Sequence, residues 1–454
     1  MSTTSQNVSS KRWSILGVMC LALIVASLDS LVITMTIPSL SVHLKATTSQ
    51  LQWSVDSYAL AFASTLIFMG AIADRYGRKF AFIIGLVLFG LSSALAAFAG
   101  SMEVLISART FMGLGGALIM PSTLAILKDV FPPEERPKAM GIWVGVSSLG
   151  IPLGPLVGGF LLSTFWWGSV FLVNVPIIVI AMIGAIILIP ESRNRNHPGL
   201  DLLGLFTSIL GALFVVDAII EAPVRGWLSP WTICLFLFGI VTILWFLRRD
   251  SRAEFPVLGE AAFHNHHFYV PLITIASLFF TVFGSLFLLT IRMQSELSMS
   301  PILAGLHIMP LCAAALMAPI APRLVHRYGL GKISSIGPLL SVFSMIILVA
   351  TDSPGSFAIV SAMTILGIGI GIGAPTSVDA ILEATPADQS GAGSAVADVA
   401  MQGGGALGIA VMGSLMATSA ATGWTGYLSG AIVSAIGTLL VRCLLRENNE
   451  SYVV

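Results

Sequence analysis

The sequence predicts an all-α membrane protein in which two six-helix bundles are separated by two inserted central helices. Three observations lead to this fold class: an apolar composition, a series of apolar runs of membrane-spanning length, and an internal repeat. Of the 454 residues, 56% are hydrophobic and 10% are charged. Soluble domains carry about 25% charged residues, so we expect a multi-pass membrane protein.

The apolar runs predict fourteen transmembrane helices, because each run has about the 20 residues that a spanning helix needs. The first run follows Lys11 and Arg12 and is too long for a signal peptide. The predicted spans are 14–37, 53–73, 80–100, 104–127, 139–163, 168–190, 202–221, 230–247, 269–291, 301–321, 332–351, 357–382, 390–417 and 424–446.

The basic residues predict the orientation, because cytoplasmic loops carry an excess of Lys and Arg. With the N-terminus inside, most of the 22 Lys and Arg residues lie on the cytoplasmic side. Those that fall outside are Lys45, Arg225 and Arg292, and Arg109 lies within a span. We therefore predict a protein of the cell membrane with both termini in the cytoplasm.

A short repeat predicts how the helices are grouped. Arg75-Tyr76-Gly77 follows the second span, and Arg327-Tyr328-Gly329 follows the tenth. If two six-helix halves followed each other directly, fewer residues would separate the two copies in the sequence. The two additional spans at 202–247 account for the extra residues. We therefore predict an N-terminal bundle over 1–192, inserted helices over 193–255 and a C-terminal bundle over 256–454.

Charged residues inside the spans are the candidate functional residues, since a charge at mid-membrane costs from about 2.5 to more than 10 kcal/mol. The first is Asp29 in "LIVASLDSLVITMTIP", and Arg109 lies in "LISARTFMGLGG". The other candidate acids are Asp56, Asp398 and Asp379. Two structural alternatives stay open: an acid that pairs with Arg109 only to hold helices together, and an arginine that snorkels to the interface.

Two motifs give the chain a family resemblance. "GAIADRYGRK", which contains Gly70, Asp74, Arg75, Gly77 and Arg78, resembles the cytoplasmic loop signature of the major facilitator superfamily. The resemblance implies the major facilitator fold, and a latch in which Asp74 and the bases hold the two halves together. "GIPLGPLVGG", with Gly150, Gly154, Pro155, Gly158 and Gly159, resembles the motif of exporters and antiporters in this superfamily. Its glycines recur every four residues and form a smooth face for a neighbouring helix.

Two further stretches narrow the resemblance to one branch of the superfamily. "LDSLVITMTIPSL" and "WSVDSYAL", the latter with Trp53, Asp56 and Tyr58, resemble the first two helices of fourteen-helix drug:proton antiporters. The chain is most similar to exporters of quaternary ammonium compounds. This implies a monomeric, proton-coupled multidrug efflux antiporter in which Trp53 and Tyr58 line the substrate cavity.

The implied mechanism is exchange at a carboxylate, for which protons and a cationic drug compete. Asp29, Asp56, Asp398 and Asp379, with Arg109, are the candidates for proton coupling and substrate binding. Aromatic side chains add cation–π attraction of about 0.5–2 kcal/mol. The expected partners are lipophilic, cationic small molecules, protons and the bilayer.

Other classes of function are disfavoured. The net charge of zero gives no reason to expect nucleic acid. The sequence has no phosphate-binding loop and no nucleophile–base or metal-ligand spacing, so we expect no enzyme, no metal and no cofactor beyond the proton motive force. His264, His266 and His267 are interpreted as an interfacial segment. An uptake symporter, an exporter of a neutral or specific endogenous compound, and a non-transporting sensor remain alternatives.

Overall fold

The computed structural model describes residues 3–132, 134–192, 202–250, 266–350, 356–383, 390–418 and 424–446, and the regular structure in these ranges is helical. The helices of the N-terminal half are α1 (Thr3–His43), α2 (Thr48–Tyr76), α3 (Arg78–Ala97), α4 (Met102–Val130), α5 (Arg136–Thr164), α6 (Ser169–Leu172) and α7 (Asn174–Leu188). The inserted helices are α8 (Leu202–Arg225) and α9 (Pro230–Asp250). The C-terminal half contains α11 (His266–Ile291) with a π-helical end at Arg292–Glu296, α12 (Pro301–Ile308), a 3₁₀ turn at Met309–Cys312, α13 (Ala313–Met317), α14 (Ala321–Tyr328), α15 (Leu330–Ala350), α16 (Ser356–Glu383), α17 (Ser390–Thr418) and α18 (Trp424–Arg446).

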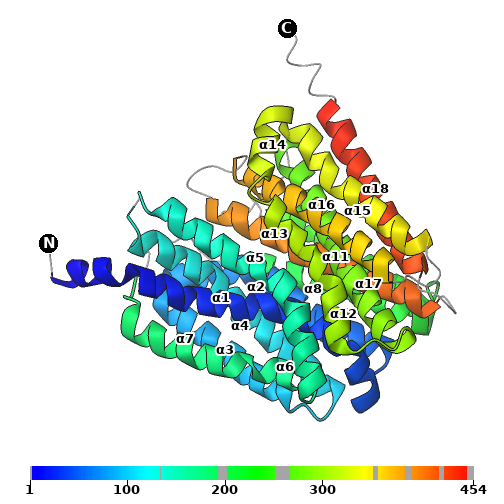
Figure 1. Ribbon diagram of the computed structural model, residues 1–454, viewed down its shortest axis with the longest axis horizontal. Helices are drawn as coiled ribbons and strands as arrows, with labels where there is room; N and C mark the ends of the chain where they lie inside the picture. The colour runs from blue at the N-terminus through cyan, green and yellow to red at the C-terminus, as the bar shows by residue number, and fades with distance from the viewer. Residues whose placement is uncertain are drawn as a thin grey trace, which may run out of the picture.

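The helices form two bundles (Figure 1). In the first, α1 packs on α5 and α7, and α4 packs on α2 and α3. In the second, α11 packs on α16, α17 and α18, and α15 packs on α16 and α18. This arrangement is the all-α fold that the apolar runs predict.

Eleven helical stretches in the described ranges are long and apolar enough to cross a membrane. The three other predicted spans, 53–73, 139–163 and 301–321, lie on α2, on α5 and on the segment from α12 to α14. The count of fourteen stays a prediction.

Two predicted spans are interrupted in the structure. The span 168–190 divides at Val173 into α6 and α7, because Pro176 has no N–H to bond the carbonyl of Leu172. The span 301–321 divides around the 3₁₀ turn that contains Pro310. Apolar composition gives the position of a span, but these breaks are set by backbone groups that proline leaves unpaired.

The two copies of the Arg-Tyr-Gly repeat end helices in the same manner. Gly77 follows α2 with φ +127°, and Gly329 follows α14 with φ +84°. Residues with a Cβ rarely adopt these backbone conformations, so glycine is suited to both helix ends. In each copy the arginine lies over the ring of the tyrosine beside it, at 5.7 Å for Arg75 and 5.3 Å for Arg327.

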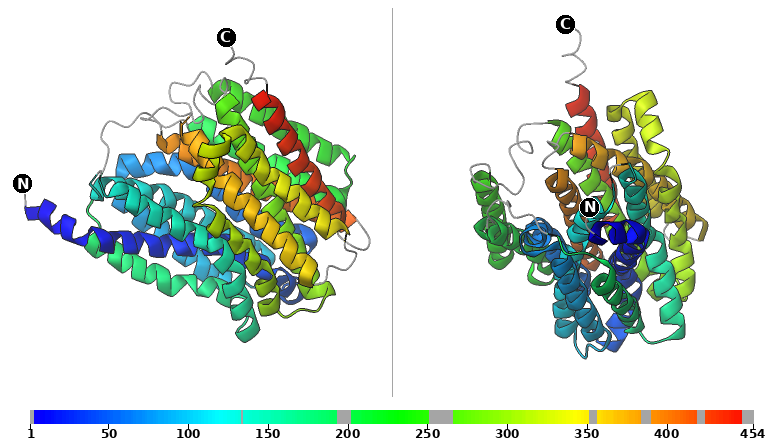
Figure 2. Two further views of the ribbon diagram at one scale, coloured as in Figure 1. Left: turned by 45° about the horizontal axis from the view of Figure 1, so that its top comes forward. Right: turned by 90° about the vertical axis from the view of Figure 1, so that its left-hand side faces the viewer.

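The bundles touch at the end of the molecule opposite the chain termini, a contact region that we call the distal joint. Figures 1 and 2 show the bundles approaching each other there, while the free ends of α1 and α18 lie on the other side. Gln52 on α2 donates to the carbonyl oxygens of Ile409 and Ala410 on α17, at 3.1 and 3.0 Å. Gln294, which follows α11, donates to the carbonyl oxygen of Met35 on α1 at 3.1 Å.

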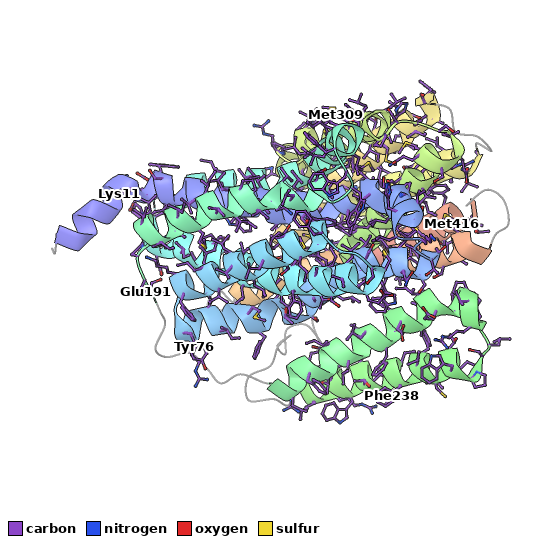
Figure 3. The ribbon with its side chains drawn as sticks, turned by 90° about the horizontal axis from the view of Figure 1, so that it is seen from below. Lys11, Tyr76, Glu191, Phe238, Met309 and Met416 are labelled. Carbon is purple, nitrogen blue, oxygen red and sulfur yellow. The ribbon has the colours of Figure 1, made fainter. Side chains whose placement is uncertain are left out.

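The inserted pair lies against one flank of the two bundles (Figure 3), and α9 packs on α8. Helix α8 contacts both α2 and α17, so it covers the seam where these two helices meet. Ser414 of α17 donates to the carbonyl oxygen of Ile219 at 2.8 Å, and Ser49 of α2 donates to Glu221 at 2.5 Å. The inserted pair is therefore bonded to both bundles.

Candidate functional site

The centre of the candidate site is an ion pair between Asp29 of α1 and Arg109 of α4. The guanidinium Nη1 donates to the carboxylate Oδ2, and both side chains are fully buried. A pair removed from water gives little net stability, but removal of one partner leaves an uncompensated charge at a cost of about 3–5 kcal/mol. The state of Asp29 and the position of Arg109 are therefore strongly linked.

Arg109 is held from three sides. Its Nε donates to the carbonyl oxygen of Ser54 at 3.1 Å, which ties α4 to α2. Its guanidinium carbon lies 4.5 Å from the ring centre of Tyr58 and 5.9 Å from that of Phe171, within the range of cation–π attraction. The Nη2 atom is buried without a hydrogen-bond partner. The arginine thus does not snorkel to the interface in this structure but lies inside the bundle.

Tyr58 belongs to the wall around Arg109. It is buried, and its ring stacks on that of Phe62 with the ring centres 6.1 Å apart. Its hydroxyl donates to the carbonyl oxygen of Ala26 at 3.3 Å. Trp53, the other predicted aromatic of the substrate cavity, is half-buried and packs against the apolar cluster formed by α2, α8 and α17. The two aromatics therefore lie in different surroundings, one within the N-terminal bundle and one at its flank.

The other oxygen of Asp29 is bonded by a residue that the sequence analysis did not select. Asn174, the first residue of α7, donates from Nδ2 to Asp29 Oδ1 at 3.1 Å and to Ser93 Oγ at 3.0 Å. Ser93 on α3 donates in turn to the carbonyl oxygen of Phe171 at 2.8 Å. The one available signal was a lone amide in the apolar run "FLVNVPIIV", whereas Ser93 carried none.

Asp56 on α2 is fully buried and forms no hydrogen bond with Arg109. Neither of its carboxylate oxygens has a hydrogen-bond partner in the described part of the chain. An acid with no partner in an apolar environment strongly disfavours the charged form. Asp56 lies one helical turn from Gln52, so it is near the face of α2 that meets α17.

The two remaining acids lie in the C-terminal bundle. Asp398 on α17 is partly buried. Asp379 is exposed near the end of α16. The structure thus brings Asp29 and Arg109 together and leaves Asp56, Asp398 and Asp379 on three other helix surfaces.

The glycine motif of α5 forms two contacts at once. A Cβ at Gly150 would overlap Ser27 of α1, and one at Gly158 would lie 2.9 Å from Val32 of α1. On another face, a Cβ at Gly159 would lie 2.5 Å from the carbonyl oxygen of Pro301 of α12.

Pro155 and Gly154 complete the motif. A Cβ at Gly305 of α12 would lie 2.5 Å from the carbonyl oxygen of Pro155, and Gly154 is buried. Close approach of small residues is the basis of helix packing in membranes. Helix α5 thereby joins α1 in its own bundle and α12 in the other, as part of the distal joint.

The loop motif after α2 contacts its own bundle. Arg78 forms an ion pair with Asp129 at the end of α4, at 2.5 Å, and the Lys79 ammonium donates to the carbonyl oxygen of Ile186 at 2.8 Å. A Cβ at Gly70 would lie 3.4 Å from Pro121 of α4. Arg75 is exposed, and the side chain of Asp74 lies outside the described residues, as does His264. The bases at 78 and 79 are therefore used within the N-terminal bundle in this conformation.

The chain belongs to the Major Facilitator Superfamily. The family model matches residues 19–409 and 273–452, which together cover nearly the whole chain. The protein is thus a multi-pass membrane transporter and not an enzyme.

The relatives place it among the efflux transporters of this superfamily. It is 32% identical to the multidrug efflux pump LfrA of Mycolicibacterium smegmatis, over 94% of this chain and 86% of that protein. It is 30% identical to the tetracenomycin C resistance and export protein of Streptomyces glaucescens, over 92% of this chain and 78% of that protein. It is 33% identical to the methyl viologen resistance protein SmvA of Salmonella typhimurium, over 90% of this chain and 83% of that protein.

Solved structures share the fold. The crystal structure of the peptide transporter POT in complex with sulfate superposes on this protein with a TM-score of 0.72 at 15% sequence identity. The superposition covers 99% of each chain. At this identity the likeness concerns the arrangement of helices alone.

Proposed function

We propose that the protein is a proton-coupled antiporter that exports lipophilic, cationic compounds from the cell by alternating access. The observation that carries the proposal is the fully buried ion pair of Asp29 and Arg109. An intramembrane ion pair of this kind is costly to build, and such residues commonly mark proton and ion pathways.

Protonation of Asp29 would change the balance of forces inside the N-terminal bundle. The neutral carboxyl no longer compensates the charge of Arg109, whose Nη2 already lacks a partner. The resulting penalty is about 3–5 kcal/mol, enough to favour a rearrangement of α1 against α2 and α4. Transfer of one proton to Asp29 can therefore drive a change between two conformations.

The substrate would compete with protons for the other acids. Asp56 and Asp398 lie on α2 and α17, the helices that meet at the distal joint from opposite bundles. A carboxylate with few bonding partners attracts a cation, and a bound proton removes that attraction. Competition of this kind is sufficient for exchange, because binding of either ligand displaces the other.

Inward proton flow would supply the energy. A pH difference of one unit contributes about 1.4 kcal/mol per proton, and 100 mV contributes about 2.3 kcal/mol per charge. With the termini in the cytoplasm, the distal joint lies on the outer side, and this conformation would accept its substrate from the cytosol.

The test uses purified protein in liposomes with an acidic interior and a fluorescent pH reporter. Ethidium or methyl viologen is added outside. We expect the cation to release protons from vesicles containing the wild type, and not from those containing Asp29→Asn or Asp398→Asn. The matched control is Glu134→Gln, an exposed acid in the loop before α5, which should retain exchange.

Three outcomes would contradict the proposal. If no cation releases protons but a neutral compound does, the protein exports uncharged compounds and cation recognition is wrong. If substrate moves in the same direction as the proton, the protein is an uptake symporter. A full response from Asp29→Asn would show that the ion pair only holds helices together.

A further inference from the structure

The hydrogen bonds beyond the ion pair give Asp29 a second partner of a different kind. Asn174 is 1% exposed and faces α1 and α3 from the first turn of α7. Its amide lies 3.1 Å from Asp29 Oδ1 and 3.0 Å from Ser93 Oγ, so it connects the acid to the hydroxyl. The buried series ends at the backbone of α6, where Ser93 donates to Phe171.

The local chain fixes the position of this amide. Asn174 directly follows the break at Val173, and Pro176 lies in the first turn of α7. Proline is tolerated in a first turn because the N–H groups there have no partner within the helix. The amide is therefore held by a helix start and not by a mobile loop.

An amide suits both protonation states of a carboxyl group. A charged carboxylate only accepts hydrogen bonds, whereas a protonated carboxyl also needs an acceptor for its proton. The Asn174 side chain carries donors on Nδ2 and an acceptor on Oδ1, so a half-turn of the amide offers either. The Ser93 hydroxyl can likewise accept from the amide or donate to it.

We propose that Asn174, supported by Ser93, is a positioning residue that holds the Asp29 carboxyl in its charged and its protonated form. It thereby sets the pH at which this carboxyl exchanges its proton. This inference rests on the proposed function, in which Asp29 carries the proton.

Of the groups that contact Asp29, the Asn174 amide is the one that can bond both protonation states of the carboxyl. Arg109 of α4 is the charged side chain in contact with Asp29 among the described residues, and it bonds the opposite oxygen. Helix α3 contributes the neutral Ser93, and α5 contacts α1 through the uncharged Gly150 and Gly158. Arg109 supplies the charge that favours carboxylate, while Asn174 is the bonding group that can serve both states.

The experiment measures the proton on Asp29 directly, by infrared difference spectroscopy of the full chain in lipid. The carboxyl band that disappears in Asp29→Asn identifies Asp29, and its titration midpoint is then compared between variants. Both forms lose a hydrogen bond in Asn174→Ala, but the charged form loses more, because a hydrogen bond to a carboxylate is about twice as strong as one between neutral groups. The midpoint should therefore move up by about one pH unit, a tenfold change in proton affinity.

Three further variants make the result specific. Ser93→Ala should move the midpoint in the same direction by less, and it is the second test should Asn174→Ala fail to fold. Asn174→Gln keeps the amide, so its midpoint should lie between that of Asn174→Ala and that of the wild type. Ser92→Ala is the matched control: Ser92 is a buried neighbour on α3 whose hydroxyl donates to the carbonyl of Leu88 in its own helix. Its midpoint should equal that of the wild type.

The outcomes separate this inference from the proposed function. A titrating Asp29 band whose midpoint is the same in Asn174→Ala, Ser93→Ala and wild type would overturn the positioning role and leave the antiport proposal standing. Absence of any titrating Asp29 band, together with proton exchange that survives Asp29→Asn, would overturn both.

Discussion

Substitution of Gly159 by alanine should weaken the distal joint without disturbing either bundle. Gly159 lies on α5 and faces α12 of the other bundle, where an added Cβ would meet the carbonyl oxygen of Pro301 at 2.5 Å and the Cα of Ile302 at 2.9 Å. Both are backbone atoms, so no side-chain rotation relieves the overlap. The two bundles must move apart or the joint must open.

The magnitude follows from the overlap. An ordinary contact of this kind lies at 3.4 Å or more, so the helices must separate by about 0.9 Å. Overpacking of this size costs about 1–3 kcal/mol. If the cost falls on the joined conformation alone, the ratio of joined to open molecules decreases about five- to 150-fold.

Distances between spin labels on the two bundles measure this ratio. Val42 at the end of α1 and Phe357 at the start of α16 are 73% and 86% exposed, so both tolerate a labelled cysteine. The four native cysteines are first replaced. The long-distance population should increase in Gly159→Ala.

Two alanine variants serve as controls. Gly17→Ala has no atom within 4 Å of its new Cβ and should behave as the wild type. Gly150→Ala overlaps Ser27 inside one bundle, so it should lower the unfolding temperature without shifting the label distances. An unchanged distance distribution in folded Gly159→Ala would refute the argument that this glycine contact holds the joint.

Three further predictions use other contacts. Gly77→Ala should lower the free energy of unfolding by about 1–3 kcal/mol, because Gly77 has a positive φ and the new Cβ would displace Glu191 Oε1, which accepts hydrogen bonds from the backbone N–H groups of Lys79 and Ser192. Gly329→Ala should cost less, because nothing lies within 4 Å of its Cβ, and thermal unfolding in detergent would show this order. Gln52→Ala removes the side-chain bonds from α2 to α17 and should favour the open state about fivefold, as measured with the same labels. Arg109→Lys retains the charge but not the planar group that bonds Ser54 and Asp29 together, so cation-driven proton release should fall at least tenfold while the protein stays folded.

The sequence predicts the helices well because a spanning helix needs a long apolar run. The closely packed face of α5 was also predictable, since glycines at every fourth residue lie on one side of a helix, and Gly150 and Gly158 do face α1. The pairing of Asp29 with Arg109 was one of two alternatives, as two costly buried charges of opposite sign stabilise each other.

Other features depend on contacts that no local pattern specifies. Gln52 lies in a stretch with several other polar residues, and its partners on α17 lie more than three hundred residues away. Ser93 is one of two adjacent serines on α3, and only the tertiary structure distinguishes the one that faces Asn174 from the one that bonds its own helix. The helix break before Asn174 depends on a proline whose effect on the bundle is not evident from composition.

The position of α8 makes the two sides of the molecule unequal within the plane of the membrane. The bundles meet along two seams, one between α2 and α17 and the other between α5 and α12. Helix α8 covers the first seam from the surrounding lipid, whereas no described helix outside the bundles packs over the second. Among the described helices, a lipophilic compound that diffuses within the bilayer would therefore reach a seam between the bundles directly only where α5 packs on α12. The inserted pair thus leaves one of the two seams between the bundles facing the lipid directly.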